Sequence, residues 1–273
     1  QKRAQQKKRY SVSSIAMAMR LFKPRGDVAI LGAPRNEVGQ RANEFLRSVK
    51  MSRAFYVAEH EVTEKQYQQI VGKGKASNLP VTNVTWIEAV RFCNELSKRE
   101  GLKPYYTIRG NGVIFSKNSD GYRLPSESEW EWVSRKFKKR VPTIYSWGNR
   151  NKIPSGAGNI ADESAKGITK GYVARYNDSH AEIAPVKSFS AEKNGLFDMF
   201  GNVSEWVGDY YSLNPYDSKK IYEDLVNSRP SKSNVIKGAS WKSSSVTELR
   251  ASYREGLIGK REDVGFRIAR NAE

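Results

Sequence analysis

The chain has 273 residues, of which 38% are hydrophobic and 11% aromatic, a composition that favours a globular protein over a disordered one. It carries 47 Lys and Arg against 29 Asp and Glu, a formal net charge of +18, and no apolar run approaches the length of a membrane-spanning helix. The single cysteine, Cys93, excludes an internal disulfide and a cysteine metal cluster.

The first feature in chain order is a basic segment over residues 1–25, which contains Lys and Arg but no acidic residue. We predict a poorly ordered basic amino-terminal arm over residues 1–25, followed by one domain over residues 26–273. Such an arm could bind nucleic acid, a membrane surface or an acidic protein, but no motif for specific nucleic-acid recognition follows it. Because the first residue is Gln rather than Met, we expect that a secretion signal has been removed.

Three helices are predicted next, each from a Ser or Thr followed three residues later by Glu or Gln. These capping boxes begin at Thr63, Thr85 and Ser126. Cys93 lies on the apolar face of the second helix, which indicates a core residue rather than a reactive thiol. Short alternating stretches at residues 54–62, 121–125 and 264–270 predict strands.

The central region, residues 146–193, is rich in Gly, Asn, Asp and Ser and has little periodicity. A loop of this length inside a domain needs bound ions or polar networks to order it. Further on, the stretch "KGASWKSSSVTELRASYREG" contains several serines but no Gly-x-Ser-x-Gly motif. The only histidines, His60 and His180, are distant in sequence, so we predict a serine-rich loop without a catalytic nucleophile.

An ordered set of motifs in this chain resembles the formylglycine-generating enzyme family, also called sulfatase-modifying factors. The set is "EVTEKQYQQI", "PVTNVTWIEAVRFCNELSKREG", "YRLPSESEWEWVSR", "YSWGN", "APVKSF", "NGLFDMFGNVSEWVGDYY", "VIKGASW" and "DVGFRIAR". The resemblance covers residues 26–270. It implies an α+β fold, the family's variant of the C-type-lectin-like fold, which is loop-rich with few short strands and about three helices.

The resemblance also implies two structural calcium sites built from hard oxygen ligands. The first would use the side chains of Asp198 and Glu205 and the carbonyls of Gly201 and Val203. The second would use the side chains of Asn159 and Asp178 and the carbonyls of Ile160 and His180. The competing interpretation is that these polar residues only cap turns.

Active members of the family hold copper with two cysteines beyond a "GGS" turn and oxidise a substrate cysteine to formylglycine. The matching turn here is "KGASW", where the first cysteine position is Ser243 and the second falls within residues 244–248, which contain no cysteine. Copper(I) prefers thiolate ligands, which serine does not supply. We therefore predict a protein without copper, without catalytic residues of this type and without cysteine-oxidising activity.

A non-catalytic relative is expected to bind a protein partner. The resemblance to bacterial relatives suggests a periplasmic or otherwise exported immunity protein that neutralises a toxin of type VI secretion, with an acidic effector attracted by the basic surface. The predicted partner-binding groove consists of Ser240, Trp241, Lys242, Ser243, Ser244, Tyr210, Tyr211 and Tyr216. The alternative is a periplasmic oxidase or tautomerase of the siderophore-maturation type, with Glu248, Glu255 or Tyr253 as the acid–base residue.

Overall fold

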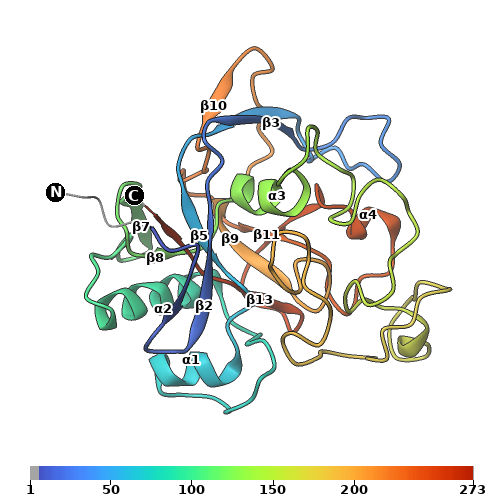
Figure 1. Ribbon diagram of the computed structural model, residues 1–273, viewed down its shortest axis with the longest axis horizontal. Coiled ribbons are helices and arrows are strands. Elements are labelled where there is room, and N and C mark those ends of the chain that lie inside the picture. The colour runs from blue at the N-terminus through green and yellow to red at the C-terminus, as the bar shows by residue number, and fades with distance from the viewer. Residues whose placement is uncertain (1–5, 273) are drawn as a thin grey trace.

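The computed structural model describes residues 6–272, and its central element is a five-stranded antiparallel sheet with the strand order β1-β2-β5-β14-β8. The strands are β1 (Arg9–Val12), β2 (Met17–Phe22), β5 (Phe55–Ala58), β8 (Tyr122–Arg123) and β14 (Ala269–Asn271). Because β14 lies between β5 and β8, the last strand joins the first part of the chain in one sheet (Figure 1).

The expectation of a poorly ordered arm over residues 1–25 is wrong for residues 9–22, which form β1 and β2; residues 1–5 lie outside the described residues. Charge dominates this segment, but its apolar residues point inward. Those buried are Val12, Ile15, Met17, Met19 and Phe22. Since a strand turns successive side chains to opposite faces, basic residues such as Arg20 can stay exposed while Met19 enters the core. The domain therefore begins before residue 26.

The remaining strands of residues 6–272 form three smaller sheets. The four-stranded sheet has the order β12-β11-β9-β13, with β13 parallel to β9. Its strands are β9 (Ser204–Tyr210), β11 (Asn234–Lys237), β12 (Arg254–Leu257) and β13 (Val264–Phe266). A three-stranded sheet contains β3 (Asp27–Leu31), β4 (Arg47–Met51) and β10 (Ile221–Glu223). A two-stranded sheet contains β6 (Tyr106–Arg109) and β7 (Gly112–Phe115).

The three predicted helices are α1 (Glu64–Val71), α2 (Trp86–Arg99) and α3 (Glu127–Arg135). Thr63 and Ser126 form complete capping boxes, whereas Thr85 caps only the Glu88 amide, and the Glu88 side chain instead contacts Tyr67. A fourth helix, α4 (Val246–Leu249), was not predicted although Ser245 and Glu248 form the same capping box. A 3-10 turn, η1 (Glu163–Ala165), lies in the central loops.

The loop-rich segment over residues 146–193 lies on the far side of the molecule from α1 and α2 (Figure 1). It is held by a small hydrophobic cluster of its own, formed by Tyr145, Ile160, Tyr176, Phe200, Ala239 and Leu249. Two larger clusters lie under the sheets, and Cys93 is buried in one of them as predicted. The α+β, loop-rich fold class is confirmed, although the strands are more numerous than expected. No helix within residues 6–272 combines the length and apolar character that crossing a bilayer requires.

Candidate functional site

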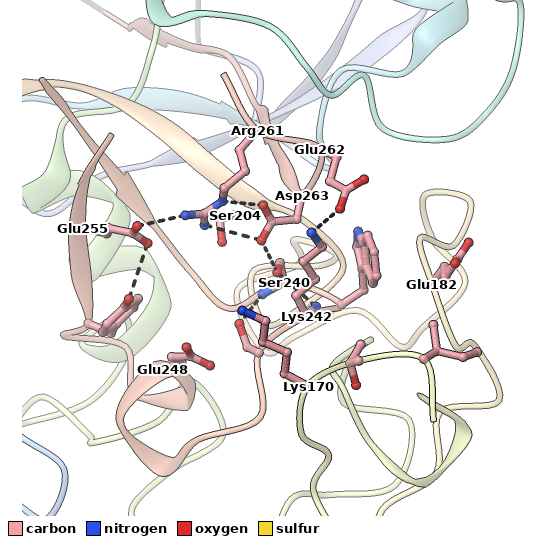
Figure 2. Close-up of a pocket in the computed structure, with 15 residues that line it drawn as sticks. Lys170, Glu182, Ser204, Ser240, Lys242, Glu248, Glu255, Arg261, Glu262 and Asp263 are labelled. Carbon is pink, nitrogen blue, oxygen red and sulfur yellow. Dashed lines mark hydrogen bonds and ion pairs between the residues drawn. The ribbon is translucent and has the colours of Figure 1, made fainter. Parts of the chain in front are cut away.

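The candidate site is a pocket of about 620 Å³ beside the turn that follows β11, which we call the groove. It is bounded by this turn, by β12, by the loop before β13 and by the loop at residues 168–170 (Figure 2). Its lining residues are Ile168, Thr169, Lys170, Glu182, Ser204, Ser240, Trp241, Lys242, Ser243, Glu248, Tyr253, Glu255, Arg261, Glu262 and Asp263. The predicted residues Ser240 to Ser243 therefore all reach this pocket.

One wall of the groove is fixed by a charged network (Figure 2). Arg261 Nε donates to Asp263 Oδ1 at 2.6 Å, and its Nη1 donates to Glu255 Oε1 at 2.8 Å. Ser240 Oγ donates to the other Asp263 oxygen at 2.6 Å. Asp263 is buried, and its two partners on separate segments hold the turn against the loop before β13. Burial lowers the pKa of Arg261, but its bonds to the Asp263 and Glu255 carboxylates outweigh this effect and raise it, so this wall stays charged.

Ser243, at the first expected cysteine position, is a structural residue of the turn. Its Oγ accepts a hydrogen bond from the Ser240 amide at 2.9 Å, and its own amide donates to the Ser240 carbonyl at 3.0 Å. No histidine lines the groove: His60 bonds the Glu61 carbonyl, and His180 bonds the Asp178 carbonyl. A serine without a base has no means of activation, which supports the interpretation of a serine-rich loop.

The acids proposed for the alternative function are also in the groove, but Glu248 has a structural role. Its Oε2 accepts from the Ser244 amide at 3.0 Å, while Ser245 caps α4. Ser244 itself does not line the groove. Tyr253 Oη donates to Glu255 Oε2 at 3.4 Å, and burial together with Glu255 raises the pKa of Tyr253 to about 12.

The polar groups of the groove outside the charged network differ in how far they are already paired. The Trp241 ring is 9% exposed, and its Nε1 is buried without a hydrogen-bond partner among the described residues. Lys170 and Glu182 are exposed and form no ion pair within residues 6–272 (Figure 2). Lys242 pairs with the exposed Glu262. An unpaired buried donor costs folding free energy that a ligand acceptor would recover.

The three tyrosines assigned to the groove from sequence do not line it. Tyr210 is at the opposite end of β9 from Ser204, about 20 Å away for six residues of extended chain, and packs on Trp86. Tyr211 packs under Arg254, and Tyr216 packs against Tyr222. These tyrosines were assigned to the groove because they lie close in sequence to the start of β9. The strand is long enough to place them away from the groove.

The first predicted calcium site is a buried acidic cluster around Arg267. Arg267 Nε and Nη2 donate to the two oxygens of Glu205 at 2.7 and 2.8 Å, and Nη2 also donates to Glu61 at 3.2 Å. Asp198 Oδ1 and Glu61 Oε1 are buried and have no hydrogen-bond partner within residues 6–272. Burial, with repulsion between these carboxylates, raises the pKa of Asp198 to about 6 and that of Glu61 well above its usual value.

Asp198 Oδ1 has no hydrogen-bond partner among residues 6–272 and could serve a cation, whereas Arg267 already bonds both oxygens of Glu205, so Glu205 would have to share them. Asp198 and Gly201 adopt left-handed backbone conformations, with φ of 58° and 82°, in the turn that precedes Val203. Within residues 6–272 no group of three His, Cys, Asp or Glu side chains is arranged as a metal site. Carbonyls would therefore have to supply part of the coordination.

The second predicted calcium site is already filled by hydrogen bonds. The two oxygens of Asp178 accept from the amides of His180 at 2.8 Å and Ile160 at 2.9 Å. Burial and the nearby Asp162 raise the pKa of Asp178 to about 6. Asn159 Oδ1 alone lacks a partner. This arrangement fits the competing interpretation, a hydrogen-bonded loop, better than a cation site.

Comparison with known proteins shows the family to which the chain belongs. The sequence profile of the sulfatase-modifying factor enzyme 1-like domain matches residues 22–272. The chain belongs to this family. The match begins within β2, in agreement with the strands found before residue 26.

Similar proteins in this family include members described as inactive. Over 237 residues the chain is 28% identical to the chaperone protein LppX of Paenibacillus barcinonensis, with 80% of each chain covered. It is 25% identical over 249 residues to the inactive C-alpha-formylglycine-generating enzyme 2 of Bos taurus, covering 87% of this chain and 63% of the bovine protein. Among solved structures, Treponema denticola variable protein 1 shares the fold, with a TM-score of 0.77, 23% identity and coverage of 96% and 98%.

The family's copper chemistry lacks its ligands in this member. The chain has one cysteine, and it lies on α2 in the hydrophobic core rather than in the groove. Burial raises the pKa of the Cys93 thiol far above its usual range, so thiolate formation there is suppressed. The residues at the copper-binding positions are instead engaged in turn and helix-capping hydrogen bonds.

Proposed function

We propose that this family member is a non-catalytic binding protein that holds a segment of a protein partner in the groove. The observation that carries the proposal is an open pocket without thiols, lined by Trp241, whose buried Nε1 has no hydrogen-bond partner among the described residues. An extended partner segment offers the carbonyl acceptor that this donor lacks. The similarity to a chaperone protein and to an inactive enzyme homologue supports a binding role.

The finer proposal concerns the partner and the compartment. We infer an acidic secreted effector, such as a toxin delivered by type VI secretion, and a periplasmic or otherwise exported immunity protein that neutralises it. The net charge of +18 supports this choice, because opposite charge accelerates encounter. Lys170 and Lys242 would then contact acidic side chains at the rim of the groove.

The test is capture of the partner by tagged wild-type protein, followed by affinity measurements on the purified pair. Trp241→Phe keeps an aromatic ring but removes the indole N–H, so we expect affinity to fall about 5- to 30-fold. Lys220→Ala, an exposed change outside the groove, is the control. A partner whose affinity is the same with Trp241→Phe would contradict the groove, and a partner without acidic character would contradict the finer proposal.

The contact between Tyr253 and Glu255 favours a second candidate function, a periplasmic oxidase or tautomerase of the siderophore-maturation type. In this function Glu255 would move a proton at the substrate and Tyr253 would position it. The test is turnover of a chromophoric substrate by the wild-type protein and by Glu255→Gln. Loss of turnover in the variant supports this candidate, whereas equal rates remove it.

We also propose that the acidic cluster around Arg267 binds structural calcium. Asp198 and Glu205 would supply carboxylate oxygens, and Gly201 and Val203 would supply carbonyls. The Asp198 oxygen that has no partner among the described residues supports this proposal. The second site would use Asn159 and Asp178 as side-chain ligands and Ile160 and His180 as carbonyl ligands. Calcium could bind there only if the hydrogen bonds from the Ile160 and His180 amides to Asp178 rearranged.

A further inference from the structure

A second cavity of about 300 Å³ opens at the end of α3 and shares no lining residue with the groove. It lies between this helix end and the loops at residues 146–157 and 190–194. We propose that it binds a small, uncharged aromatic alcohol of the phenol class, with the ring against Phe137 and Trp147 and the hydroxyl group at Ser134 and Glu192. The volume is at the lower end of the range for small-molecule sites.

The aromatic walls of this cavity are held in place before any ligand arrives. The Trp147 ring stacks on the Tyr145 ring with a centroid distance of 4.6 Å and an interplanar angle of 2°. It also meets the Phe200 ring in an edge-to-face contact with a centroid distance of 4.7 Å. Trp147 Nε1 donates to the Arg150 carbonyl at 2.7 Å. Phe137 packs edge-on against Phe22 at 5.3 Å. Rigid aromatic surfaces favour a flat ring, because offset or edge-on contacts are formed without reordering the site.

One of the polar side chains that line the cavity is unused by the described chain. Ser134 is 3% exposed, and its Oγ has no hydrogen-bond partner in the described chain. Glu192 accepts from Asn194 Nδ2 at 3.3 Å, and burial raises the pKa of Glu192 to about 7. A hydroxyl ligand both donates and accepts, so it can satisfy the serine and the carboxyl group together.

Charges of both signs line the cavity, and each is unfavourable to a ligand group of the same sign placed beside it. Glu192 opposes a carboxylate, while Lys139 and Lys193 oppose an ammonium group. Lys139 is itself occupied, because its Nζ donates to Thr143 Oγ1 at 2.9 Å and to the Ser146 carbonyl at 3.4 Å. An apolar ring with a neutral hydroxyl group is the ligand that meets these conditions.

The test compares p-cresol with toluene, which has the same ring and methyl group without the hydroxyl. Binding is followed by NMR through the Trp147 indole N–H of the full chain. We expect p-cresol to bind about tenfold more tightly than toluene, because a site built for a hydroxyl rejects the analogue that lacks it. Ser134→Ala should reduce this ratio several-fold, and Phe137→Ala should weaken both ligands.

Lys220→Ala is the matched control and should leave both affinities unchanged. Ser134→Ala removes an unpaired hydroxyl, so this variant should fold with undiminished melting temperature and keep the test interpretable. The proposal would be overturned if the two ligands bound with equal affinity or if Ser134→Ala left their affinity ratio unchanged. It would also be overturned if p-cresol did not bind up to about 10 mM.

Discussion

At the scale of single residues, Arg267 has the largest set of polar contacts in the buried interior beside the groove. It bonds Glu205 and Glu61 and the carbonyls of Phe197, Ala58 and Glu59, and the surrounding carboxylates raise its pKa. Because its partners come from three segments that are far apart in sequence, this buried guanidinium holds those segments together. Its loss would leave two buried carboxylates without a counter-charge.

Arg267→Met is therefore expected to lower the free energy of unfolding by about 3–5 kcal/mol, the usual cost of breaking a buried ion pair. Urea denaturation measures the change. Arg20→Met, which removes a partly exposed partner of Glu59, should cost less than about 1 kcal/mol. Similar losses for the two variants would show that Arg267 is not the central contact described here.

His60 makes stability depend on pH. It is buried, and desolvation lowers its pKa from 6.5 to about 4. Because the unfolded chain binds a proton more readily, this group's contribution is complete above pH 6.5 and is lost as pH falls towards 4. His60→Gln should flatten the unfolding free energy between about pH 6.5 and 4, by at most about 3 kcal/mol. Parallel pH curves for the two proteins would contradict this assignment.

At the scale of elements, β2 decides whether the basic segment belongs to the domain. It pairs with both β1 and β5, and Met17 and Met19 are fully buried. Two of the segment's basic residues, Arg9 on β1 and Arg20 on β2, therefore lie on strands of the main sheet. A partner attracted to Arg9 and Arg20 would meet a sheet surface that is already formed.

Met19→Ala is expected to destabilise the protein by about 2–5 kcal/mol, as other large-to-small changes in a core do. Lys23→Ala, an exposed change next to the same strand, should stay within about 0.5 kcal/mol. Denaturant unfolding of both variants is the measurement. A small effect of Met19→Ala would mean that β2 contributes little to the fold.

At the scale of the whole molecule, calcium would couple the acidic cluster to global stability. We expect the melting temperature to rise with calcium relative to a chelator, because a ligand that binds only the folded state stabilises it. Asp198→Asn should abolish the shift, whereas Asp178→Asn, at the second site, should leave most of it. No shift in the wild-type protein would remove calcium from this account.

The sequence by itself determined the helix starts, the family and the missing thiols, because these depend on local patterns. Ser126 with Glu129 forms its capping box within one turn, and the absence of cysteine near Ser243 needs no structure to be seen. The same local signal is present at Ser245 and Glu248, which form the capping box of α4. Local hydrogen bonds can be predicted from spacing because the chain itself holds the partners close.

Only the tertiary structure decided which distant residues meet. Asp263 lies 23 residues from Ser240, and Arg267 lies 62 residues from Glu205, so no spacing rule joins either pair. The tyrosines after β9 are close to the groove in sequence but are carried away by an extended strand. The unpaired Trp241 Nε1 is likewise a property of packing, since the partner that it lacks could have come from any segment.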